Sequence, residues 1–433
     1  MASPASAFAQ QLRSDKDAFL GELKSGKTLE NWTISVGNEA GDLDSMASAL
    51  AYAHFAAQAT PSSSRQIIPL ILTARSDLYL RPENTEALSR AGVADDSFLT
   101  IDDLPPSQLS SLGAAFALVD HNVLLPPFRS KPDTVEDEED DRRVHAIIDH
   151  HADEGRHLAA SPRLLRPVGS CASLITDHFT SSSPNISVPT PLADLLLSAV
   201  LIDTGLRPST DGGKATETDL SAVNYLLPFS SFASSTSNAT IASSEASSSA
   251  LSALMAHNTL LSQKKNDVSH LSGRDLLRRD YKEYVESGVR YGLSTVPLSL
   301  ATWLDKSSAT DGAEKWNLVL SDTRAWMDER GLDLAGVLTS YTHIKKSGKE
   351  GKHRRELLLL SRKGAALDSV FEGIERDGVL QVEEWKDLDD YPRQEGRSGE
   401  ERWKVWQQGN AKATRKQVAP VLRKLVEEAA VAK

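Results

Sequence analysis

Short apolar runs, separated by helix-like or turn-rich stretches, dominate the first half of the chain. These runs are WTISV, QIIPLIL, FALVD and VHAIID, which begin at residues 32, 66, 116 and 144. Apolar strands that alternate with helices are typical of βαβ units, whose strands run parallel within one sheet. The first half of the chain therefore predicts an α/β domain built on a parallel sheet.

A serine-rich stretch divides the sequence. With 433 residues the chain is longer than one ordinary domain, so two domains are expected. The segment 229–250, FSSFASSTSNATIASSEASSSA, is rich in serine and poor in large apolar residues, which predicts an insertion or linker. We therefore expect a parallel-sheet domain over 1–228 and a smaller, mixed α/β domain over 251–433.

Composition argues against several classes of protein. The chain has no run of 18 apolar residues that could span a membrane, and its start lacks the features of a secretory signal. The single cysteine, Cys171, excludes an intramolecular disulfide and fits a reducing compartment. The formal charge of −12 argues against a general nucleic-acid binder. We expect a cytoplasmic protein that binds neither membrane nor nucleic acid and can act as a monomer.

Acidic residues and histidines follow the ends of the apolar segments. They are Asp42 and Asp44 after WTISV, Asp120 at the end of FALVD, Asp149, His150 and His151 at the end of VHAIID, and Asp203 at the end of the helix-like PLADLLLSAVLID. Open α/β sheets bind ligands at the rim where their strands end. Carboxylates and imidazoles gathered at one rim form a ligand set for divalent ions such as Mg²⁺ or Mn²⁺.

Each acid also has a plain structural interpretation. Asp44 could cap the helix that follows it, with Asp42 as a turn residue, and Asp120 or Asp203 alone could be a cap or turn residue. Adjacent histidines after a fully apolar strand have no packing rationale, whereas neutral imidazole is a common metal ligand. The order D-x-D, D-H-N, D-H-H and a final Asp therefore favours a metal site.

That order resembles the DHH phosphoesterase superfamily, named for the triplet at 149–151. The resemblance covers most of the chain. Within the superfamily, the first motif is similar to the G-N-E-x-x-D-x-D-S of the fungal cytosolic exopolyphosphatases, which are related to prune. The matching residues are Gly37, Asn38, Glu39, Asp42, Asp44 and Ser45. The related manganese-dependent inorganic pyrophosphatases carry a histidine in place of Asn38, so this motif favours the exopolyphosphatases.

The resemblance implies two divalent ions, Mn²⁺ or Mg²⁺. One ion would be held by Asp42 and Asp120. The other would be held by Asp44, Asp120, His150 and Asp203, so that Asp120 bridges the two ions.

Three further residues receive roles from the same resemblance. Asn38 would lie near the first ion as a weak ligand or through a water. His151 would face the phosphate as a proton or hydrogen-bond donor, and Asp149 would orient one of the histidines. Asp120, His151 and Asn38 are thus the candidate catalytic residues.

Basic residues are expected where phosphates bind, and the second domain contains them. Arg362 and Lys363 follow the apolar ELLLLS, in a segment that resembles the S-R-K of the family's accessory domain. Lys282, in RRDYKEY, matches a D-x-K-x-aromatic segment of the same domain. Arginine suits bidentate phosphate contacts, and lysine acts as a point charge. The nearby tract KKSGKEGKHRR could also be a solvated, flexible hairpin.

Together these features predict an exopolyphosphatase, which hydrolyses the terminal phosphate of inorganic polyphosphate with a water activated by two metal ions. A pyrophosphatase or nucleotide phosphodiesterase of the same superfamily is the main enzymatic alternative. A non-enzymatic interaction protein with this fold is another alternative, although a complete set of acids argues against it.

Overall fold

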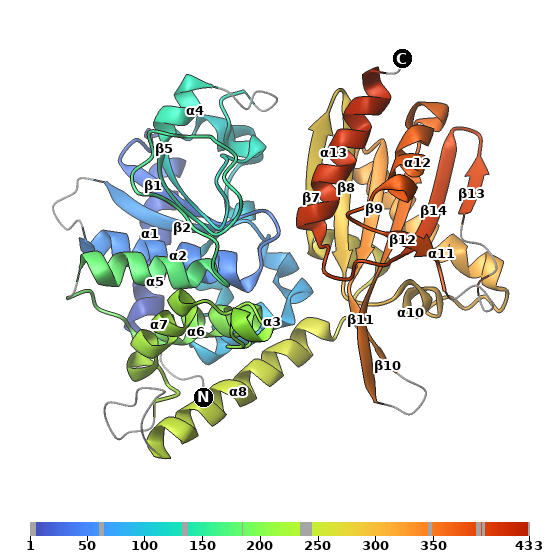
Figure 1. Ribbon diagram of the computed structural model, residues 1–433. Helices are drawn as coiled ribbons and strands as arrows, with labels where there is room; N and C mark the ends of the chain where they lie inside the picture. The colour runs from blue at the N-terminus through green and yellow to red at the C-terminus, as the bar shows by residue number, and fades with distance from the viewer. Residues whose placement is uncertain are drawn as a thin grey trace. The chain divides into compact units, whose positions relative to one another are not determined.

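A six-stranded parallel sheet lies at the centre of the first part of the chain (Figure 1). The computed structural model describes residues 6–59, 65–131, 137–183, 185–233, 245–344, 349–386, 391 and 395–431. The strands are β1 (Trp32–Val36), β2 (Gln66–Ile71), β3 (Leu99–Thr100), β4 (Ala115–Val119), β5 (Val144–Asp149) and β6 (Arg163–Leu165). Their spatial order is β3-β2-β1-β4-β5-β6, and every neighbouring pair is parallel.

Helices and short 3₁₀ turns connect these strands. The helices are α1 (Ala7–Lys24), α2 (Leu43–Ala59), α3 (Pro82–Arg90), α4 (Glu138–Arg143), α5 (Cys171–Ser182), α6 (Thr190–Thr204), α7 (Glu217–Leu226) and α8 (Glu245–Asn266). α2 has an almost entirely buried, alanine-rich surface, which lets it pack closely against β2, α5 and α6.

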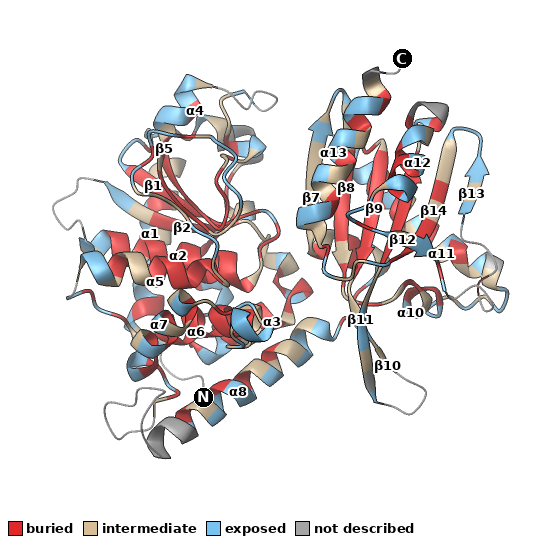
Figure 2. Ribbon diagram, in the orientation of Figure 1, coloured by how far each residue is buried: buried red, intermediate tan, exposed pale blue. Residues whose placement is uncertain are grey.

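Both faces of the sheet are buried. Along β4, Ala117 and Val119 enter one apolar cluster, which also contains side chains of α2, α5 and α6. Phe116 and Leu118 enter a second cluster with Trp32 of β1. Successive side chains of a strand point to opposite faces, so a strand covered on both sides must be apolar throughout. This explains the unbroken apolar runs, and Figure 2 shows these strands as buried.

The strand order reverses between β1 and β4. From β1 the chain moves outward to β2 and β3, then returns to β4 on the other side of β1 and continues to β5 and β6. Open α/β sheets generally bind ligands at such a reversal, beside the carboxyl ends of the two central strands. The loop with Asp42 and Asp44 follows β1, and Asp120 follows β4.

The second part of the chain contains a mixed sheet. Its strands are β7 (Tyr281–Glu286), β8 (Val289–Val296), β9 (Leu334–Thr339), β10 (Tyr341–Ile344), β11 (Glu350–Ser361), β12 (Val382–Glu384), β13 (Glu395–Ser398) and β14 (Glu401–Gln408). The main order is β12-β14-β11-β9-β8-β7, in which β8 and β9 are parallel and the other neighbours antiparallel. The helices are α9 (Gly273–Arg279), α10 (Leu300–Leu304), α11 (Gly312–Arg330), α12 (Asp368–Arg376) and α13 (Arg415–Val431). The predicted α/β class, with a parallel first sheet and a mixed second one, is confirmed.

The contacts divide the chain into two units, residues 1–265 and 266–433. Leu254 and Leu261 of α8 belong to the core of the first unit. Residues 251–265 therefore pack with the first unit, whereas the sequence boundary at 251 assigned them to the second domain. Residues 234–244 of the serine-rich segment lie outside the described residues, so its role as an insertion or linker stays a prediction.

Gly37 offers a test of how tightly β1 and α2 approach each other. A Cβ atom at Gly37 would lie 2.7 Å from Ser45 Cβ and 2.9 Å from the Ser45 carbonyl oxygen. We expect Gly37→Ala to destabilise the protein by about 1–3 kcal/mol, because the backbone of α2 has to shift. The measurement is the thermal unfolding midpoint.

Gly21→Ala is the matched control, because a Cβ at this exposed position in α1 meets nothing within 4 Å. Alanine also favours a helix over glycine by about 1 kcal/mol, so this variant should be neutral or more stable. Equal stability of Gly37→Ala and the wild type would show that the contact between Gly37 and Ser45 yields easily.

Candidate metal centre

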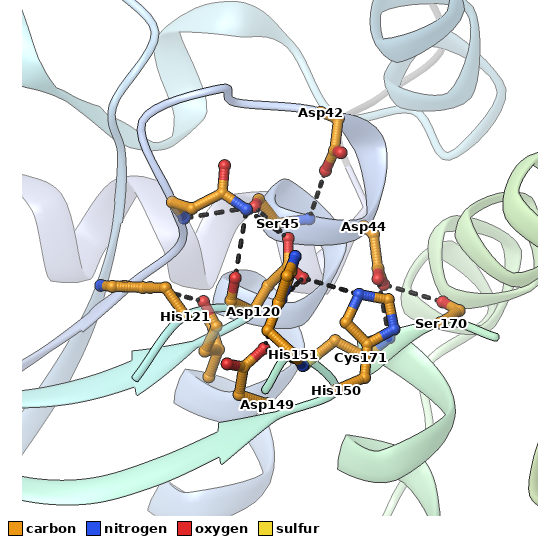
Figure 3. A network of polar contacts seen from close by, with 12 residues as sticks. Asp42, Asp44, Ser45, Asp120, His121, Asp149, His150, His151, Ser170 and Cys171 are labelled. Atoms are coloured by element: carbon orange, nitrogen blue, oxygen red, sulfur yellow. Dashed lines mark hydrogen bonds and ion pairs between the residues drawn. The ribbon is translucent and has the colours of Figure 1, made fainter. Parts of the chain in front are cut away.

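The loops after β1, β4 and β5 bring their polar residues together at the carboxyl edge of the first sheet (Figure 3). Ligand atoms of Asp120, His150 and His151 lie within 4.8 Å of one another, which makes these residues a possible metal-binding group. Asp42, Asp44 and Asp203 act on the same cluster through their charges.

The two acids of the first loop have different structural roles. Asp42 is the N-cap of α2, since its Oδ1 accepts a hydrogen bond from the Ser45 amide at 3.0 Å. Asp44 instead reaches the N-terminus of α5. Its Oδ1 accepts from Ser170 Oγ and the Ala172 amide, both at 2.8 Å, and its Oδ2 accepts from the Cys171 amide at 2.7 Å. The interpretation in which Asp44 caps its own helix is therefore wrong.

The carboxylate of Asp44 has one acceptor position that the donors of α5 do not occupy. An ionised carboxylate has about four positions for donors, and the three donors of α5 occupy three of them. Burial, together with the neighbouring Asp120 and Asp203, raises the pKa of Asp44 well above its ordinary value. The amides of α5 therefore do not fully compensate the negative charge at this point, and a divalent cation would.

The hydrogen bonds that Asp120 accepts through its side chain reach only one of its two carboxylate oxygens. It is 2% exposed, and its φ of 60° places it in the left-handed region, which is uncommon for a residue other than glycine. Its Oδ2 accepts hydrogen bonds from Asn38 Nδ2 at 2.7 Å and from Ser45 Oγ at 2.5 Å. Its Oδ1 is buried and meets no donor at strict hydrogen-bond geometry among the described residues, but it forms close pairs with His150 and His151. This oxygen faces His150, whose Nε2 lies 3.3 Å away. Burial alone would raise the pKa of Asp120, but the contact and charge of His150, with the charge of His151, hold it below its ordinary value.

The orientation of His150 suits a metal ligand. Its Nδ1 lies 3.1 Å from the carbonyl oxygen of Val168, so Nδ1 carries the proton and donates it to that oxygen. In the neutral ring Nε2 then has a lone pair, directed toward Asp120 Oδ1. This imidazole nitrogen and the carboxylate oxygen pair with each other when the ring is protonated, and with a neutral ring they could bind one cation together, as this donor set predicts.

His151 is oriented by a second buried acid. Asp149 Oδ1 accepts from His151 Nδ1 at 2.7 Å and from the His151 amide at 3.1 Å, while its Oδ2 accepts from Asn122 Nδ2 at 2.6 Å. Burial alone would raise the pKa of Asp149, but these hydrogen bonds and the charge of His151 hold it well below its ordinary value. Asp149 therefore stays ionised and fixes the ring of His151.

Asp203 lies near the end of α6, and burial raises its pKa to about 6. Lys265 opposes this rise, and Asp42 adds to it. Asp203 therefore adds to the excess of negative charge that surrounds Asp120.

Asn38 contacts Asp120 directly. Besides the bond to Oδ2, its Nδ2 donates to the Asp120 carbonyl oxygen at 3.1 Å, and its Oδ1 accepts from the Ala40 amide at 2.9 Å. It therefore influences the cluster through Asp120, and a role as a weak metal ligand stays a prediction.

The predicted phosphate ligands belong to the second unit. Arg362 donates from Nη1 to Asp328 Oδ1 at 2.5 Å and from Nη2 to the Arg324 carbonyl at 3.0 Å. Lys363 Nζ lies 3.1 Å from Asp333 Oδ1. Lys282 is in β7, paired in register with Leu293 of β8. Their role in binding phosphate stays a prediction.

Sequence patterns did not reveal the residues that hold the first loop from outside. Arg81 is 5% exposed, and its Nε and Nη2 donate to the Ala40 carbonyl oxygen at 3.0 and 2.7 Å. Asn84 Nδ2 donates to the Gly41 carbonyl oxygen at 2.9 Å. Both lie at the start of α3, about 40 residues along the chain, in a segment without any motif. The sequence also gave no sign of the hydrogen bond from Ser170 to Asp44, because these residues lie 126 positions apart and Ser170 belongs to no motif.

Comparison with known proteins agrees with this geometry. Residues 32–200 match the family model of the DHH family N-terminal domain, and residues 259–425 match that of the DHHA2 domain. The chain therefore belongs to the DHH family of phosphoesterases, with a DHHA2 domain after the DHH domain. The family resemblance seen in the sequence motifs is confirmed.

Individual relatives match over most of their length. A Schizosaccharomyces pombe protein named "Putative exopolyphosphatase" is 28% identical over 413 residues, which is 91% of each chain. The Homo sapiens protein "Exopolyphosphatase PRUNE1" is 25% identical over 391 residues, 90% of this chain and 74% of that one. The solved structure of the Methanococcus jannaschii "putative family II inorganic pyrophosphatase" has the same fold, with a TM-score of 0.51 and 21% identity, covering 91% of this chain and 99% of that one.

The helices that the structure describes include none with the length and apolar character needed to cross a membrane.

The contact between Asn84 and the first loop leads to a prediction about metal affinity. We expect Asn84→Ala to weaken Mn²⁺ binding roughly tenfold or more, because residues that orient metal ligands typically contribute 10- to 100-fold to affinity. Isothermal titration calorimetry of the metal-free protein measures this without any need for activity.

Asn410→Ala is the control for this experiment. It also removes an amide that donates to a backbone carbonyl, that of Val379, but in the second unit. Unchanged Mn²⁺ affinity in Asn84→Ala would contradict a role of α3 in positioning Asp42.

Proposed function

We propose that this protein is an exopolyphosphatase, which releases the terminal phosphate of inorganic polyphosphate with the help of two divalent ions, Mn²⁺ or Mg²⁺. The observation that carries the proposal is the group of Asp120, His150 and His151, whose possible ligand atoms lie within 4.8 Å of one another at the carboxyl edge of the first sheet. The names of the S. pombe and human relatives support the choice of substrate.

The ions would be held by Asp42, Asp44, Asp120, His150 and Asp203, with Asp120 shared between them. When bound, such ions lower the pKa of a water and stabilise the charge that develops on an attacked phosphoryl group. Residues around these side chains fix their orientation before any ion binds. Asn38 and Ser45 donate to one oxygen of Asp120, the other oxygen lies beside His150 and His151, and the Val168 carbonyl orients the ring of His150.

Asn38 also bears on the choice between polyphosphate and pyrophosphate. The manganese-dependent pyrophosphatases have a histidine at this position, whereas Asn38 donates its amide to Asp120. An asparagine binds a metal through Oδ1, and this atom of Asn38 already accepts a hydrogen bond from the Ala40 amide, so it would be a weak ligand. The first ion would then have one protein ligand fewer, which supports the exopolyphosphatase branch.

His151 would handle a proton at the phosphate. Its Nδ1 is bound to the ionised Asp149, so Nε2 is the nitrogen that can donate to a phosphate oxygen. A buried carboxylate behind an imidazole fixes the orientation of the ring. His151 is therefore proposed as the donor to the phosphate, and Asp149 as the residue that positions it.

Phosphates of the substrate would be bound by Arg362, Lys363 and Lys282. Because Arg362 and Lys363 already pair with Asp328 and Asp333, a phosphate has to compete with these carboxylates. A phosphate carries more negative charge than one carboxylate, so it can displace these carboxylates. We place the reaction in the cytoplasm, as expected from the sequence.

The substrate can be tested by phosphate release in the presence of Mn²⁺ or Mg²⁺. We expect release from tripolyphosphate and long-chain polyphosphate, and little from pyrophosphate or a cyclic nucleotide. Asp120→Asn should reduce the rate more than about a hundredfold, since it removes the charge that two ions would share. Chelation of the metal should abolish the activity reversibly.

Preferred cleavage of pyrophosphate or the nucleotide would overturn the substrate and leave the metal centre. Full activity of Asp120→Asn with tight metal binding would overturn the bridging role. No metal-dependent release from any substrate would favour an interaction protein.

A second experiment separates the two histidines. His151→Asn should lower kcat on the order of 10²- to 10⁴-fold, as expected for the loss of a proton donor, with Mn²⁺ affinity unchanged. His150→Asn should weaken Mn²⁺ binding itself. A loss of Mn²⁺ affinity in His151→Asn would instead make His151 a metal ligand, since it lies in the same group as Asp120 and His150.

A further inference from the structure

The second unit carries a two-stranded ribbon that extends beyond its sheet. β10 pairs only with β11 and lies off the main order of strands. β11 pairs with β14 from Arg355 onward and with β9 from Leu357 onward, so its first residues, 350–354, have β10 as their only partner among the described strands. Figure 1 shows β10 and the adjoining part of β11 projecting from the sheet. Side chains on both faces of such a ribbon reach solvent.

This ribbon is strongly basic although the protein is acidic. The segment 341–355 contains six lysines and arginines and a single glutamate, in a chain with a formal charge of −12. Lys352 is exposed and Arg354 is partly exposed. The next acid along β11, Glu356, is 1% exposed and bonded to Tyr341, Trp385 and Thr339, so it does not neutralise the ribbon's surface.

The cations of the ribbon differ from those elsewhere in the same unit. On the sheet and helices, arginines are held by carboxylates at 2.6–2.9 Å, as in the pairs Arg324–Glu401, Arg402–Asp368 and Arg415–Asp280. Lys352 and Arg354 form no ion pair with any carboxylate that the structure describes. Their charges are therefore available to an external anion without the loss of an existing ion pair.

We infer that this ribbon, through Lys352 and Arg354, binds the part of a long polyphosphate chain that lies beyond its terminal residues. The inference rests on the proposed function and adds a second binding site for the same substrate. Residues two apart in a strand are about 6.8 Å apart, so a strand presents cations at regular intervals to a repeating anion. Each exposed charge contact is weak and screened by salt, so one contact adds little to the affinity. A long chain makes several such contacts at once, and the ribbon therefore favours long chains.

The test compares substrates of different length. In the double variant Lys352→Gln and Arg354→Gln, KM for long-chain polyphosphate should rise roughly three- to tenfold at low salt, with kcat unchanged. KM for tripolyphosphate should not change, because a chain of three phosphates has no part beyond its terminal residues. The effect should decrease at high salt. The charge-conserving variant Lys352→Arg and Arg354→Lys should retain the wild-type KM.

The control removes the same charge elsewhere in the unit. Lys416 and Lys424 are exposed on α13, and their replacement by glutamine should leave both KM values unchanged. An equal rise in KM for both substrates in the ribbon variant would overturn the inference, as would an equal rise in the control. No change in the ribbon variant would overturn it as well.

The inference can fail separately from the proposed function. If the wild type hydrolyses neither substrate, equilibrium dialysis with long-chain polyphosphate decides the matter. Binding that is lost in the ribbon variant and kept in the α13 control supports the ribbon site, and equal binding by all three overturns it. Binding of a single-stranded oligonucleotide through the same two residues, without binding of polyphosphate, would assign the ribbon to a different polyanion and also overturn the inference.

Discussion

The gathering of buried carboxylates and histidines at the carboxyl edge of the first sheet is the constraint on which the site depends. Asp44 and Asp120 are buried close to each other, and burial together with mutual repulsion raises the pKa of Asp44. The fold supplies donors for most of their oxygens, from the N-terminus of α5, Asn38 and Ser45. The second oxygen of Asp120 lies 3.3 Å from Nε2 of His150, so these two atoms could also bind one cation.

The spacing of two residues between Asp42 and Asp44 has a physical reason in this geometry. Residues two apart at a helix start point in different directions. Asp42 therefore caps α2, while Asp44 reaches across to the N-terminus of α5. One short loop thus joins two helices to the end of β1. Arg81 and Asn84 hold the carbonyl groups of the same loop from the other side, so its backbone is anchored from three directions.

The second unit uses its positive charge in two ways. Most of its arginines join neighbouring strands and helices through carboxylates, which stabilises the unit and reduces their availability to ligands. The ribbon of β10 and β11 keeps its charge exposed. The tract KKSGKEGKHRR left both a solvated hairpin and a phosphate surface open, and the described part of the hairpin agrees with either, because exposure and ligand binding are compatible.

Sequence alone determined the fold class and the place of the candidate metal ligands after the strands. Strands buried on both faces must be apolar throughout, so the polar residues that end them stand out. Only the tertiary structure decided which helix Asp44 caps and which oxygen of Asp120 receives the hydrogen bonds of Asn38 and Ser45. It also decided which residues outside the motifs bind the loop after β1. These contacts join residues 40 to 130 positions apart, and hydrogen bonds between distant segments leave no periodic signal in the sequence.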